Sequence, residues 1–86
     1  MAVFLISYDL RKTDFDYQPL FDALHEIGAK HLQESVWGVR IEWSSENVFD
    51  HLWRHMHDVS DRLLVVHFES IDGYKSQNTI NKLSTL

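Results

Sequence analysis

The chain has 86 residues and a mass of 10.2 kDa, which allows one small domain. Thirteen acidic residues against eight basic ones give a net charge of -5, which argues against a protein that coats nucleic acid indiscriminately. The absence of cysteine excludes a disulfide scaffold, a thiol nucleophile and every cysteine-based zinc motif. A hydrophobic fraction of 44% is enough for a core. A domain this short still buries only about 60–65% of its unfolded surface, so a partner subunit would stabilise it.

The longest apolar run, residues 1–6, is too short to span a bilayer. It has no basic segment before it and no small-residue cleavage site after it, so it does not resemble a signal peptide. These features predict a cytoplasmic protein with no membrane partner.

The first half of the chain predicts a strand followed by a helix. Residues 2–8 form a continuous β-branched and aromatic run, typical of a strand buried on both faces. The helix is predicted to begin after Asp16 as N-cap, to tolerate Pro19 in its first turn and to stop at Gly28. Its apolar residues fall at helical spacing on one stripe: Tyr17, Leu20, Phe21, Leu24 and Ile27.

The second half predicts a hairpin, a helix and a strand. Residues 29–37 and 39–43 read as two antiparallel strands, with Gly38 as either their turn or a bulge. Ser44 and Ser45 cap a helix, residues 58–61 form a turn, and residues 63–68 form a second fully apolar strand. The helix is predicted to bury one stripe: Val48, Phe49, Leu52, Trp53 and Met56.

The resulting order β-α-β-β-α-β predicts an α+β, ferredoxin-like domain over residues 1–69. We expect a four-stranded antiparallel sheet with both helices on one face and the two apolar strands in its middle. The bare face would bind a ligand or a second copy of the chain. Residues 70–86 are predicted to form a tail, either a short helix carrying Ile80 and Leu83 or an extended arm on a neighbour.

Asp9, at the end of the first strand, is the strongest candidate for chemistry. A carboxylate in a strand-end loop can hold Mg²⁺, and a two-fold dimer would bring a second Asp9 to the same ion. Alternatively, Asp9 only ends the strand and caps the turn. The adjacent pair Arg11 and Lys12 could hold phosphate, or could be ordinary solvated charge.

The remaining candidates favour structural roles. His51 and His55 are spaced to chelate a metal, but a solvated helix face is the simpler interpretation. Trp37 and Trp43 are more simply core or interface residues than base-stacking platforms. Motifs for a serine nucleophile, a nucleotide phosphate loop or a dinucleotide fold are missing from the sequence.

Three local stretches, together with the element order, resemble a known family. They are residues 6–10 (ISYDL), 33–37 (QESVW) and 61–66 (DRLLVV). The chain resembles the small CRISPR-associated endoribonucleases and their relative, virulence-associated protein D, and more narrowly the short SinR-like bacterial and phage proteins. The resemblance covers about residues 2–69.

This resemblance implies a homodimer that cuts phosphodiester bonds in RNA or DNA with Mg²⁺. Asp9 from each copy would hold the metal, and the nucleic-acid-binding residues would be Tyr8, Arg11, Lys12, Ser35 and Trp37. Some relatives act as adaptors without cutting. The second hypothesis is therefore a non-catalytic dimeric module, binding another protein as an adaptor or as half of a toxin–antitoxin pair.

Overall fold

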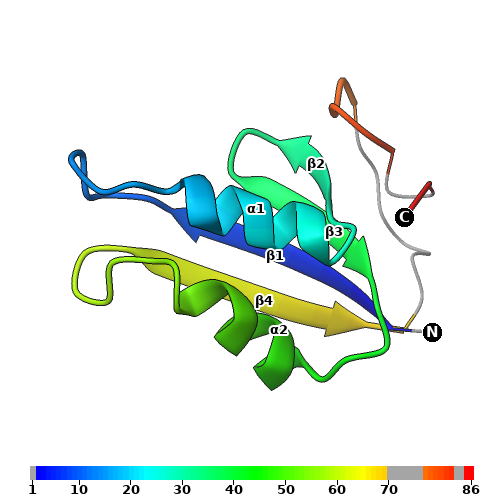
Figure 1. The fold of residues 1–86 in the computed structure, drawn as a ribbon. Coiled ribbons are helices and arrows are strands. Elements are labelled where there is room, and N and C mark those ends of the chain that lie inside the picture. Colours follow the sequence, from blue (N-terminus) through cyan, green and yellow to red (C-terminus); the bar gives the residue numbers. More distant parts are fainter. Residues whose placement is uncertain (1, 70–76, 83–84) are drawn as a thin grey trace.

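The computed structural model describes residues 2–69, 77–82 and 85–86, and the predicted element order is confirmed (Figure 1). The elements are β1 (Val3–Asp9), α1 (Gln18–Glu26), β2 (Lys30–Gln33), β3 (Val36–Arg40), α2 (Ser45–Trp53) and β4 (Arg62–Phe68).

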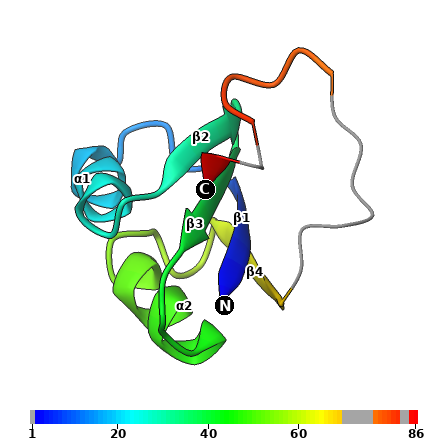
Figure 2. The same ribbon diagram turned by 90° about the vertical axis from the view of Figure 1, so that its right-hand side faces the viewer.

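The strands form one antiparallel sheet in the order β2-β3-β1-β4. Both helices cover the same face of this sheet, as Figure 2 shows from the side. The arrangement is α+β and compatible with a ferredoxin-like fold. The other face of the sheet carries no helix, and we call it the open face.

The core lies between the sheet and the helices. Alternation along β1 points Phe4, Ile6 and Tyr8 toward the helices. The side chains of Phe4 and Ile6 are fully buried. Five residues of the predicted stripes supply the opposite side of the core and are buried: Leu20, Leu24, Val48, Leu52 and Met56. Ala23, which was not predicted, is buried beside them. The stripes predicted from helical spacing are therefore confirmed at the first four of these five positions, whereas Met56 is buried but lies beyond the end of α2.

The predicted place of the second apolar strand is wrong. β4 lies at an edge of the sheet, and β1 and β3 occupy the middle. Leu64 is 59% exposed and Val66 is 41% exposed, because alternation turns them to the open face. An apolar run indicates that both faces of a strand favour burial, but it does not show whether the chain itself or another molecule covers each face.

The hairpin turn is not at Gly38. It lies at Glu34 and Ser35, between β2 and β3, and the bulge falls in β2 between His31 and Gln33. Gly38 sits inside β3 opposite Leu5 of β1. β3 also ends at Arg40, so the predicted strand to residue 43 is too long.

The helix ends follow the sequence closely. Ser44 caps α2 as predicted, since its hydroxyl accepts a hydrogen bond from the Asn47 amide at 3.1 Å. Gly28 ends α1 with φ of +79°, a conformation that favours glycine. The N-cap of α1 is Tyr17 and not Asp16, although Asp16 accepts a hydrogen bond from the Gln18 amide at 3.0 Å.

The described tail residues run back along β2 and β3 of their own chain. The amide of Ile80 donates to the carbonyl of Leu32 at 2.8 Å. Residues 77–82 contain no α-helix, and Leu83 of the predicted helix lies outside the described residues. A membrane-spanning helix needs about 20 apolar residues. α1 and α2 have nine each, and the described ranges hold no candidate span.

Candidate functional site

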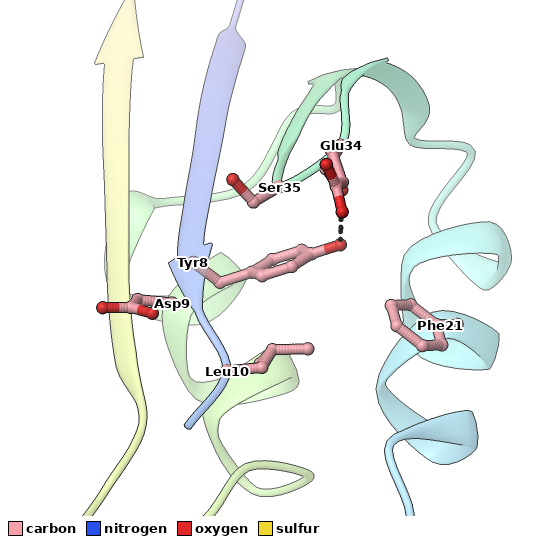
Figure 3. A pocket seen from close by; sticks show the side chains of 6 residues that line it. All are labelled: Tyr8, Asp9, Leu10, Phe21, Glu34 and Ser35. Carbon is pink, nitrogen blue, oxygen red and sulfur yellow. Dashed lines mark hydrogen bonds between the residues drawn. The ribbon is translucent and has the colours of Figure 1, made fainter. Parts of the chain in front are cut away.

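Asp9 is the last residue of β1, and its side chain lies on the open face. Tyr8 and Asp9 leave the strand in opposite directions, with Tyr8 pointing toward α1 and Asp9 toward β4 (Figure 3). The Asp9 side chain is 47% exposed, so its carboxylate can meet a ligand or a second chain. The predicted position at the strand end is therefore accessible.

Two arginines flank the Asp9 carboxylate. Oδ2 of Asp9 lies 3.2 Å from Nη1 of Arg11 and 3.6 Å from Nη1 of Arg62. Arg62 reaches Asp9 because the two residues are directly paired in the β1–β4 register. Both guanidinium groups are more than half exposed, and exposed ion pairs contribute at most about 1 kcal/mol each. An anionic ligand could therefore displace them from Asp9 at little cost.

The loop that carries Arg11 and Lys12 is anchored by Asp61, which is buried. Asp61 accepts hydrogen bonds from the Arg11 amide at 2.8 Å, the His57 amide at 2.8 Å and the Tyr17 hydroxyl at 2.6 Å. The same hydroxyl accepts from the Lys12 amide at 3.2 Å. One carboxylate thus ties the loop after β1 to the start of α1 and to the loop before β4.

The pKa values in this anchor follow from its contacts. Burial alone would raise the pKa of Asp61, but the hydrogen bonds from Arg11, Tyr17 and His57 stabilise the carboxylate and lower the pKa below its ordinary value. Burial, and then the hydrogen bond to Asp61, raise the pKa of the Tyr17 hydroxyl. Asp61 is therefore ionised and Tyr17 protonated at neutral pH.

Tyr8 and Trp37 form a buried pair on the helix side of the sheet. Nε1 of Trp37 donates to the Tyr8 hydroxyl at 3.0 Å, and that hydroxyl donates to the Glu34 carbonyl at 3.3 Å. Burial is the main cause that raises the pKa of Tyr8. Trp37 also stacks on His31 with ring centroids 4.4 Å apart. The interpretation of Trp37 as a core residue is confirmed, and neither ring shares the face of Asp9.

Ser35 lines a pocket together with Asp9, whereas Lys12 forms an ion pair with a different carboxylate. The Ser35 carbonyl accepts from the Tyr8 amide at 3.1 Å, and Ser35 and Asp9 line the same pocket of about 420 Å³ (Figure 3). The Lys12 ammonium pairs with Asp14 at 3.3 Å. Of the predicted set, Arg11 therefore contacts Asp9, while Ser35 and Tyr8 line the same pocket as Asp9.

One chain does not by itself supply a set of metal ligands. In the described ranges no group of three histidine, aspartate or glutamate side chains is placed to hold an ion. Mg²⁺ in proteins is commonly held by one or two carboxylates, with water and substrate phosphate completing its shell. Two Asp9 side chains from two copies would fit that requirement, and one would fit it poorly.

His51 lies in α2 and has other contacts, whereas His55 lies in the turn after α2. Nε2 of His51 lies 3.3 Å from the Ala23 carbonyl of α1, and its ring packs edge-on against Trp43 at 5.3 Å. These contacts join α2 to α1 and to the loop before α2. Whether His51 and His55 bind a metal stays an open prediction.

Three residues of this region were not predicted as site residues: Arg62, Asp61 and Tyr17. Arg62 could have been found by pairing the first and last strands, because antiparallel alignment sets Asp9 opposite it. Asp61 had no such signal, since its donors lie up to 50 residues away in sequence.

The chain was also compared with known families, and no family model matches it. The resemblance to the small CRISPR-associated endoribonucleases therefore remains a prediction. Any function proposed for the chain therefore rests on the geometry around Asp9.

Proposed function

We propose that the protein is a homodimeric, Mg²⁺-dependent endonuclease that acts on RNA or DNA at a pair of Asp9 residues. The observation that carries the proposal is an exposed strand-end carboxylate on the open face with two guanidinium groups beside it. Carboxylates suit a hard divalent ion, and guanidinium groups suit the oxygens of a phosphodiester.

Apolar side chains on the same face support the homodimer. Leu64 and Val66 are exposed there, opposite Ser7 and Leu5 of β1, and Leu64 lines a pocket together with Asp9. Two copies that pack these residues together would remove apolar surface from water. A two-fold axis near this end of the sheet would bring the two Asp9 carboxylates to one site.

In this dimer each residue has a defined task. Mg²⁺ between the two carboxylates would supply an activated water and neutralise phosphoryl charge. Arg11 and Arg62 would turn from Asp9 to the phosphate oxygens, and the Ser35 hydroxyl would donate a hydrogen bond to the same group. Tyr8 and Trp37 would act from inside the core by fixing the end of β1, without touching the bases.

The test compares Asp9→Asn with Asp14→Asn, a matched change in the neighbouring loop. Asp14 pairs with Lys12 and does not touch Asp9. Purified wild type is incubated with single-stranded RNA, duplex RNA and duplex DNA, with Mg²⁺ or with a chelator. Cleavage should require Mg²⁺ and fall at least about 100-fold in Asp9→Asn, the size typical for loss of a group that stabilises developing charge.

Asp14→Asn should cut within about threefold of wild type, because exposed charges far from the metal contribute little. Equal cleavage by wild type and Asp9→Asn would identify a contaminating nuclease. A wild type that cuts none of these substrates with Mg²⁺ would refute the enzymatic proposal.

A second candidate function is a non-catalytic dimeric module that binds another protein. The observation in its favour is that Asp9 is neutralised by two arginines within one chain, on a protein of net charge -5. Such a module would form the same dimer and retain a specific protein partner, without cleaving nucleic acid under any metal.

A further inference from the structure

The open face is unequally covered. Its β1–β4 half exposes Leu64 and Val66, whereas the β2–β3 half is overlaid by the described C-terminal residues. Figure 2 shows those residues returning to β2 and β3. We call residues 77–82 and 85–86 the C-terminal strap.

Four hydrogen bonds attach the strap to the sheet. The Ile80 amide donates to the Leu32 carbonyl at 2.8 Å, and the Asn81 side chain donates to the His31 carbonyl at 2.7 Å. At the other end, Lys30 Nζ donates to the Thr85 carbonyl at 3.0 Å and Arg40 Nε donates to the Leu86 carbonyl at 2.6 Å.

An apolar contact seats the end of the strap on Gly38. A Cβ atom built at Gly38 would lie 2.6 Å from Cδ1 of Leu86 and 3.1 Å from Cδ1 of Leu32. Gly38 pairs with Leu5, which places the missing side chain on the open face. Glycine at this strand position therefore makes room for Leu86. Leu32 lies on the same face beside Leu86, and it is buried, with 5% of its surface exposed.

We propose that the strap is a self-bound cover that competes with a second copy of the chain for the open face. Two packed sheets lie about 10 Å apart, so the layer above β3 holds either Leu86 or the side chains of a second sheet. With the strap in place, only the β1–β4 half and the Asp9 end stay free, so a second copy can cover β3 only after the strap has left it. This competition rests on the homodimer of the proposed function, whereas the attachment of the strap does not.

The attachment is tested by amide hydrogen exchange on the full chain. In Leu86→Ala and in Gly38→Ala, the Ile80 amide should exchange at least about tenfold faster than in wild type, because local opening becomes easier. The double variant should exchange no faster than Leu86→Ala alone, since the clash requires both side chains. Leu64→Ala, on the same face but away from the strap, is the control and should leave the exchange of the Ile80 amide unchanged at protein concentrations where the chain is monomeric.

Competition is tested by sedimentation equilibrium of the same variants. If the strap must open before two chains pair, the apparent Kd of the dimer is the intrinsic Kd divided by the fraction of chains whose strap is open. Leu86→Ala should therefore dimerise about fivefold more tightly, and Leu64→Ala more weakly. An unchanged Ile80 amide in both strap variants overturns the proposal. Faster exchange with an unchanged dimer constant overturns the competition, and this outcome is independent of any cleavage result.

Discussion

The buried Asp61 anchor makes the sharpest prediction about stability. Asp61 accepts three hydrogen bonds from donors in three different segments, and it is only 6% exposed. Replacement by asparagine keeps the shape but removes the charge and one of the two acceptor oxygens. The remaining amide group then faces N–H donors that it cannot satisfy.

The expected cost is about 2–3 kcal/mol for Asp61→Asn, because hydrogen bonds to a charged acceptor contribute about 1.5–3 kcal/mol each and only part of them is lost. Tyr17→Phe removes one donor to Asp61 and should cost about 1 kcal/mol. In a domain of this size, 1 kcal/mol lowers Tm by about 4–8 °C. Urea denaturation measures both variants.

The pH dependence has a defined sign. The pKa of Asp61 is lowered by folding, so its contribution is present above the unfolded pKa of about 3.9 and is lost as pH falls through the folded pKa. The stability difference between wild type and Asp61→Asn should stay constant from pH 7 to about pH 4 and shrink below that. All other acids titrate in both proteins, so the difference isolates Asp61.

The control is Asp58→Asn, an exposed carboxylate in the same turn. Its effect should stay within about 0.5 kcal/mol, as for most surface substitutions. The reasoning is refuted if Asp61→Asn is no less stable than Asp58→Asn. It is also refuted if the gap between wild type and Asp61→Asn is the same at pH 3 as at pH 7.

Two further predictions concern the helix cap and the buried ring pair. Ser44→Ala should lower the free energy of unfolding by about 1 kcal/mol in urea denaturation, because the Asn47 amide loses its acceptor. Ser45→Ala, one residue later, should change it by less than about 0.5 kcal/mol, and equal effects would contradict the assigned cap. Trp37→Phe should cost at least about 1 kcal/mol, because the Tyr8 hydroxyl loses the indole donor and the smaller ring leaves a gap in the core. Preserved stability in that variant would show that the hydrogen bond contributes nothing.

Local signals in the sequence predicted the elements that depend on neighbours along the chain. The stripe of Leu20 and Leu24 lies on one side of α1 because helical geometry repeats every 3.6 residues. Gly28 ended the helix where the backbone needs a positive φ. Ser44 capped α2 because an N-cap acts over three residues.

The N-cap of α1 was missed by one residue, and the larger errors involve contacts that are distant in sequence. Residues 63–68 were expected in the middle of the sheet, but β1 and β3 occupy the middle and leave β4 at an edge. The order of the strands depends on how distant segments pair. Gly38 was expected to serve a turn or a bulge, whereas the space that a side chain would occupy there is taken by Leu86, far along the chain. Glycine has several uses, and the sequence near Gly38 does not distinguish a turn from a close approach.

Asp61 and Arg62 show how one strand boundary serves both the core and the candidate site. Asp61 precedes β4 and turns inward to hold the backbone of Arg11, while Arg62 begins β4 and turns outward to Asp9. Alternation at a strand start gives consecutive residues opposite directions. Asp61 thus positions Arg11, whereas the β1–β4 register positions Arg62 beside Asp9. A change at Asp61 should therefore displace Arg11 from Asp9, while Arg62 keeps its place opposite Asp9 in the sheet.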